Sequence, residues 1–142
     1  MNSCPFCPIG AGDVDGEVVA YRTTNVFVLP VPWQRAKNIG HCLVLPTAHV
    51  TSLHTAPRDL LAELFDVVAQ VTAAVREAFG APGSMVLQND NIPGQMLSHL
   101  HVHAIPRSPD DGFILADPAK LEIPFGVRAQ QAAQIREVLA RR

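Results

Sequence analysis

Residues 98–105 read Ser-His-Leu-His-Val-His-Ala-Ile, a run in which histidine alternates with an apolar residue. Successive side chains of a β-strand point to opposite faces, so this alternation predicts a strand with His99, His101 and His103 on one face. Pro106 ends the run, because proline cannot donate a hydrogen bond to a neighbouring strand. The expected strand has one face in a core and one face able to carry chemistry.

Four further segments are expected as strands. Runs rich in β-branched and aromatic residues at 17–22 and 25–30 are separated by two threonines, which predicts a hairpin. The other two strands are expected at 41–46 and 84–89, and residues 91–94 are expected to form a turn. The hairpin links are too short for a parallel crossover and therefore favour antiparallel pairing.

A long helix is expected between Pro57 and Phe79. Thr55 is expected as its N-cap, and Gly80 with Pro82 is typical of a helix end. Its apolar residues recur at steps of three and four, the period of one helix face: Leu61, Leu64, Phe65, Val68, Val71, Val75 and Phe79.

A last helix is expected at 127–140, with Ala132, Ile135, Val138 and Leu139 available for packing. Strands, one long helix and then more strands predict an α+β fold with a mainly antiparallel five-stranded sheet. We expect the long helix to cover one sheet face and the other face to carry a site. No repeat or linker composition divides the chain, so residues 1–142 are expected to form one domain.

Composition narrows the functional classes. Hydrophobic residues make up 48% and charged residues 17%, with a net charge of −2, which is typical of a folded globular chain. No run of Lys or Arg could follow a nucleic acid polymer. The sequence shows neither a secretory signal nor an apolar segment of about 20 residues, so we expect no membrane association and a cytoplasmic address.

All six histidines fall into two windows, 41–54 and 99–103. Imidazole suits metal ligation and also proton or group transfer near neutral pH. Along a strand, His99 and His103 would lie about 13 Å apart, too far to act on one atom, so one end of the triad is expected to serve another purpose. The pair Cys4 and Cys7 is, in a reducing compartment, more typical of metal or redox chemistry than of a structural disulfide.

The triad segment 99–105, together with Pro93-Gly94-Gln95 before it, resembles the signature of the histidine-triad (HIT) family. The resemblance extends to 40–49 (GHCLVLPTAH) and to 4–7 (CPFC), which is similar to the N-terminal Cys-x-x-Cys of many bacterial members. It implies a HIT-like fold and a homodimer built on the long helix and an edge strand. It also implies a nucleotide substrate.

In that family the middle histidine attacks the α-phosphorus of a nucleotide and forms a covalent nucleotidyl-histidine. The resemblance assigns this role to His101. It implies that His103 steadies the phosphate or the leaving group, and that His41 supports the imidazole array, although His41 could instead be structural. Substrate contacts fall to Gln95, Gln88 and Asn89, for which turn chemistry is the alternative interpretation.

The resemblance also implies a structural zinc ion held by Cys4, Cys7, His49 and His99, with no organic cofactor. The alternative is a pair of reduced cysteines in a loose N-terminal segment. Cys42 is expected to be a small core residue.

Two departures from the family pattern bear on specificity. Met96 stands where many relatives carry Ser or Thr, and no carboxylate follows the second strand, where relatives bind ribose. Trp33 could stack on a base there or belong to the core. The expected activity is hydrolysis or transfer on phosphoramidates, adenylates or dinucleoside polyphosphates. Alternatives are a nucleotide-binding regulatory protein with little turnover and a catalytic metal site built by the triad itself.

Overall fold

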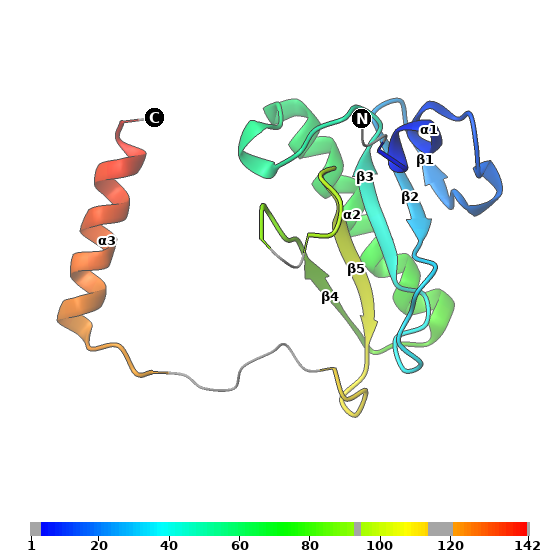
Figure 1. Cartoon of the computed structure of the whole chain (residues 1–142). Helices are drawn as coiled ribbons and strands as arrows, with labels where there is room; N and C mark the ends of the chain where they lie inside the picture. The colour runs from blue at the N-terminus through cyan, green and yellow to red at the C-terminus, as the bar shows by residue number, and fades with distance from the viewer. Residues whose placement is uncertain (1–3, 93–94, 114–120, 142) are drawn as a thin grey trace. The chain divides into compact units, whose positions relative to one another are not determined.

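Five strands form one antiparallel sheet in the order β1-β2-β3-β5-β4 (Figure 1). The pairing confirms the expected α+β class with a five-stranded antiparallel sheet. The strands are β1 Tyr21–Arg22, β2 Val26–Pro30, β3 Cys42–Pro46, β4 Gly83–Leu87 and β5 Val102–Arg107.

This computed structural model describes residues 4–92, 95–113 and 121–141, so part of the expected 91–94 turn lies outside the described residues. Contacts between residues divide the chain into two compact units, Met1–Gly112 and Phe113–Arg142. The sheet belongs to the first unit.

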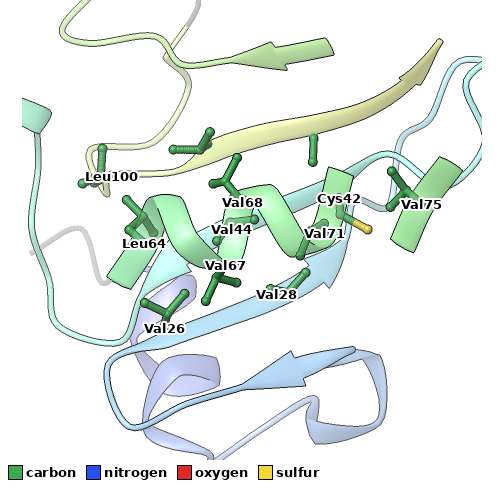
Figure 2. Packing of buried hydrophobic residues seen from close by; sticks show 12 residues of the cluster. Val26, Val28, Cys42, Val44, Leu64, Val67, Val68, Val71, Val75 and Leu100 are labelled. Carbon is green, nitrogen blue, oxygen red and sulfur yellow. The ribbon is translucent and has the colours of Figure 1, made fainter. Parts of the chain in front are cut away.

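Helix α2, Arg58–Phe79, covers one face of the sheet (Figure 2). Its inward stripe, which includes Leu64 and Val68, packs against Val26 and Val44 of the central strands. Leu100, Val102 and Ala104 join the same cluster, so the alternating apolar residues of the triad segment face this core as expected.

The start of α2 differs from the sequence prediction. Its N-cap is Pro57 and not Thr55, because Thr55 ends a short 3₁₀ turn, Leu53–Thr55, in which its hydroxyl donates to the Ser52 carbonyl. The expected end is confirmed: Gly80 adopts the left-handed conformation (φ 65°) that closes a helix without strain on a side chain.

All five strands are shorter than predicted, and two of them begin four residues late, one of which also runs through Pro106 to Arg107 beyond its expected end. Gly16–Val18 forms a 3₁₀ turn, so only Tyr21–Arg22 of the 17–22 run pairs in the sheet. The triad strand begins at Val102 and not at residue 98, because the Leu100 amide donates to the Val50 carbonyl (2.6 Å) in a neighbouring loop.

A short helix that the sequence analysis did not predict, α1 (Phe6–Ala11), lies on the opposite face of the sheet from α2. Its Phe6 and Ile9 pack against a second cluster of strand residues, Phe27, Leu29, Leu43 and Leu45. Arg22 holds the other end of α1 by donating to the Gly10 carbonyl (2.6 Å) and the Ile9 carbonyl (2.7 Å).

The second unit contains α3, Phe125–Leu139, which confirms the expected last helix within two residues. None of its residues is buried, and the expected packing positions Ile135, Val138 and Leu139 are exposed. Among the described residues, no helix combines the length and apolar character that crossing a bilayer requires.

Candidate functional site

Three histidines form a continuous line of ring contacts on the sheet face turned away from α2. The ring centroid of His103 lies 5.1 Å from that of His101 and 5.1 Å from that of His41. His41 Nε2 and His103 Nδ1 are 2.9 Å apart, a hydrogen-bond distance. The structure therefore brings together the three residues that the sequence analysis assigned to catalysis.

The backbone fixes the orientation of His101. Its Nδ1 lies 2.6 Å from the His99 carbonyl oxygen, which can only accept, so Nδ1 carries the proton. The lone pair of neutral imidazole then resides on Nε2. His101 is only 6% exposed, so the residue as a whole is largely dehydrated.

Burial keeps the neighbouring imidazoles uncharged. It lowers the pKa of His103 to about 4, with further contributions from the nearby His101 and His41 rings. Burial also lowers the pKa of His41 below its usual value. Near neutral pH the hydrogen bond between His103 and His41 therefore joins two uncharged rings.

A second cluster gathers all four predicted metal ligands: Cys4, Cys7, His49 and His99. One ligand atom from each lies within 4.8 Å of all the others. His99 Nδ1 is 3.2 Å from Cys4 Sγ and 3.9 Å from Cys7 Sγ, and Cys7 Sγ is 3.3 Å from His49 Nδ1.

These separations fit a tetrahedral metal site. Two ligands of a zinc ion, one sulfur and one nitrogen, stand about 3.6 Å apart. His99 Nε2 donates to the Pro46 carbonyl (2.9 Å), which leaves Nδ1 to face the thiols, the outer-shell pattern of metal-binding histidines. Burial and the neighbouring Cys4 raise the pKa of the Cys7 thiol, and a cation in the cluster would oppose that shift. The donor set thus suits zinc.

The three predicted substrate-binding amides lie in the segment between β4 and β5. Gln95 Nε2 donates to the Thr51 carbonyl (3.3 Å), and its Oε1 accepts from the Asn91 amide (2.6 Å). Gln88 Nε2 donates to the Asn89 carbonyl (2.8 Å). The two glutamine side chains therefore bond the backbone of neighbouring loop residues, and contacts of all three amides with a substrate stay a prediction.

The structure gives the burial of Trp33 and Cys42, the two side chains for which the sequence analysis considered a position in the core. Trp33 is 90% exposed in the β2–β3 connection, so the interpretation of Trp33 as a core residue is wrong. Cys42 is buried in the cluster beneath α2, which confirms it as a small core residue.

Sequence reasoning missed Phe6. Its ring centroid lies 5.7 Å from that of His99, edge-on, and 6.0 Å from that of His101. Phe6 thus contacts both a metal-ligand candidate and the candidate nucleophile. Its position between Cys4 and Cys7 in the sequence was the available signal.

Comparison with known families identifies this arrangement. Residues 17–110 match the model of the HIT domain. The chain belongs to the HIT family. As the sequence resemblance implied, this HIT protein also carries the N-terminal Cys-x-x-Cys.

Curated relatives of this HIT protein include nucleotide hydrolases. It is 34% identical to Protein hit of Bacillus subtilis over 79% of this chain and 77% of the relative. It is 31% identical to the adenosine 5'-monophosphoramidase hnt1 of Schizosaccharomyces pombe, over 74% of each chain. The adenylylsulfatase HINT3 of Arabidopsis thaliana is 30% identical over 78% of this chain and 55% of its own.

Solved structures support the fold. A Streptococcus mutans protein superposes with a TM-score of 0.85 at 29% identity, covering 98% of this chain and 87% of that one. A Zn-bound histidine triad family protein from Mycobacterium smegmatis gives a TM-score of 0.70 at 30% identity, covering 82% and 84%. The HIT protein therefore has the family's fold, with residues in place that could hold a metal ion.

Proposed function

We propose that this protein is a nucleotidyl hydrolase or transferase that acts at the α-phosphorus of nucleoside monophosphate derivatives. Candidate substrates are phosphoramidates, adenylates such as adenylyl sulfate, and dinucleoside polyphosphates. One observation carries the proposal: the His99 carbonyl holds the Nδ1 proton of His101, so Nε2 presents a lone pair beside the uncharged His103.

The proposed reaction has two displacements. His101 Nε2 attacks phosphorus, an N–P bond forms, and the bond to the leaving group breaks with its electron pair. A water molecule or another acceptor then attacks phosphorus and loses its proton to solvent, the N–P bond breaks and His101 regains its lone pair. His103 donates a hydrogen bond to the phosphate or leaving group, and His41, through its bond to His103, fixes that ring.

Gln95, Gln88 and Asn89 are proposed to contact the phosphate or sugar once a substrate displaces their loop contacts. Trp33 is proposed to stack on the base, because an exposed indole offers an unoccupied aromatic face. A zinc ion bound by Cys4, Cys7, His49 and His99 would supply a structural cross-link between the N-terminal segment and the sheet.

The test compares wild type, His101→Ala and the control His54→Ala, whose exposed histidine lies outside the line of ring contacts. Each is incubated with adenosine phosphoramidate, adenylyl sulfate and diadenosine tetraphosphate, while AMP release and intact mass are followed. We expect turnover and a transient nucleotidyl adduct in wild type and His54→Ala, and neither in His101→Ala. Tight AMP binding without turnover of any compound would favour the nucleotide-binding regulatory alternative.

A homodimer is also proposed. β4 is an edge strand, Val86 on it is 46% exposed, and Phe65 of α2 is 43% exposed. Pairing two β4 edges would cover Val86, and a contact between the two α2 helices would cover Phe65. Val86→Lys should then shift the protein toward monomers in analytical ultracentrifugation, and an unchanged mass would count against this interface.

A cytoplasmic address is proposed as well, since a reducing compartment would keep Cys4 and Cys7 reduced and able to bind a metal ion.

A further inference from the structure

The candidate metal cluster and the candidate nucleophile are physically connected at two points. The first is His99, whose side chain faces the thiols while its backbone carbonyl accepts the Nδ1 proton of His101. The second is Phe6, whose ring lies edge-on to His99 and also contacts His101.

Helix α1 is anchored differently at its two ends. Arg22 bonds the Gly10 and Ile9 carbonyls, so the C-terminal end stays on the sheet through contacts that need no metal. The start is held by the packing of Phe6 in the apolar cluster and by Cys4 and Cys7, whose sulfur atoms reach His99 and His49. Releasing the thiols would therefore loosen the part of α1 that contacts His101.

His101 needs such support because its described polar contacts hold it at one atom. The Nδ1 bond to the His99 carbonyl is a single contact, and a turn of the ring about Cβ–Cγ would break it and move Nε2 away from an in-line approach to phosphorus. The Phe6 ring restricts this rotation on one side, and the His103 ring, 5.1 Å away, restricts it on another. An error of about 1 Å in the position of a reacting group can cost about 100-fold in rate.

We propose that Phe6 is a positioning residue that couples occupancy of the Cys4–Cys7–His49–His99 centre to the orientation of His101. The coupling rests on the proposed function, in which His101 is the nucleophile. Loss of metal frees the start of α1, withdraws the Phe6 ring and leaves His101 to reorient.

The test uses the full chain with zinc bound and compares wild type, Phe6→Ala and Ile9→Ala. Ile9 is the matched control, because it lies on the same helix and packs in the same apolar cluster. One readout is the kcat and KM for adenosine phosphoramidate. The other is the rate at which diethyl pyrocarbonate modifies His101, followed by tandem mass spectrometry of its peptide, which requires no turnover.

We expect Phe6→Ala to retain stoichiometric zinc, to lose about tenfold or more in kcat with KM nearly unchanged, and to be modified at His101 about threefold or more faster. Ile9→Ala should resemble wild type in both readouts. Chelation of zinc from wild type should raise His101 modification to the level of Phe6→Ala, and chelation of Phe6→Ala should add little. That non-additivity distinguishes coupling from simple loss of packing.

Equal modification rates in zinc-loaded wild type and Phe6→Ala, with unchanged kcat, would overturn the proposal. If Phe6→Ala fails to fold, Phe6→Leu keeps the apolar volume without the flat ring and should show the same changes at smaller size. If wild type turns over no adenylate, the proposed function fails, and the modification rates still decide whether Phe6 positions His101.

Discussion

Acidification should destabilise this protein through His103, and substitution by glutamine should remove that component. Burial lowers the pKa of His103 to about 4, whereas the unfolded chain titrates near the ordinary value of 6.5. As pH falls below about 6.5, the unfolded chain takes up a proton at this residue and the folded chain does not. The free energy of unfolding therefore falls with pH down to about pH 4, below which both states are protonated and the effect levels off. Above about pH 7 both states are neutral at this site and the contribution disappears.

The two pKa values set the size of the effect. Between about pH 7.5 and pH 5, wild type should lose about 2 kcal/mol of unfolding free energy through His103 alone. The measurement is urea unfolding followed by far-ultraviolet circular dichroism, at several pH values with saturating zinc, for wild type and His103→Gln. Other titrating groups are common to both proteins, so the difference between the two curves reports His103 together with its coupling to the adjoining His101 and His41 rings. Parallel pH dependence in the two proteins would refute the reasoning.

Other expected outcomes concern the metal, the core and the base. Cys7→Ser should abolish stoichiometric zinc binding. When zinc exceeds its Kd a hundredfold, chelation should lower the free energy of unfolding of wild type by about 3 kcal/mol or more, measured by chemical unfolding. Leu64→Ala, beneath α2, should cost about 3 kcal/mol in the same assay. Trp33→Ala should lower kcat/KM for adenosine substrates about fivefold or more while leaving unfolding unchanged. An unaltered kcat/KM would exclude stacking.

The alternating triad segment predicted the sheet and its two faces, because a buried apolar face strongly constrains side-chain direction. Period-three and period-four spacing likewise predicted α2. The start of the triad strand was predicted too early, since alternation continues through Leu100 although the Leu100 amide bonds the Val50 carbonyl and not a strand. No local pattern in the sequence identifies a partner 50 residues away.

At the candidate site, strand alternation predicted that the triad histidines share one face, and the family resemblance implied which other side chains would gather, but neither predicted how they contact one another. The sequence resemblance named both the metal set and the histidines. The sequence did not predict the role of the His99 carbonyl in orienting His101, because every residue has a backbone acceptor. It did not predict the contact of Phe6 with His101 either, because Phe6 resembles an ordinary apolar residue. α1 was also missed, because its six residues are too few to show a helical period.

The two ends of the histidine line should differ in how readily they open. His103 lies in β5 and pairs with Leu43 of β3 on one side and Leu87 of β4 on the other. Amide hydrogen exchange near His103 should therefore require rupture of two strand pairings and approach the rate of global unfolding. The His99–His101 segment precedes the strand, and its Leu100 amide bonds the Val50 carbonyl of a loop. Its amides should therefore exchange faster than that of His103, while the burial of Leu100 and His101 keeps the candidate nucleophile in place in the folded state.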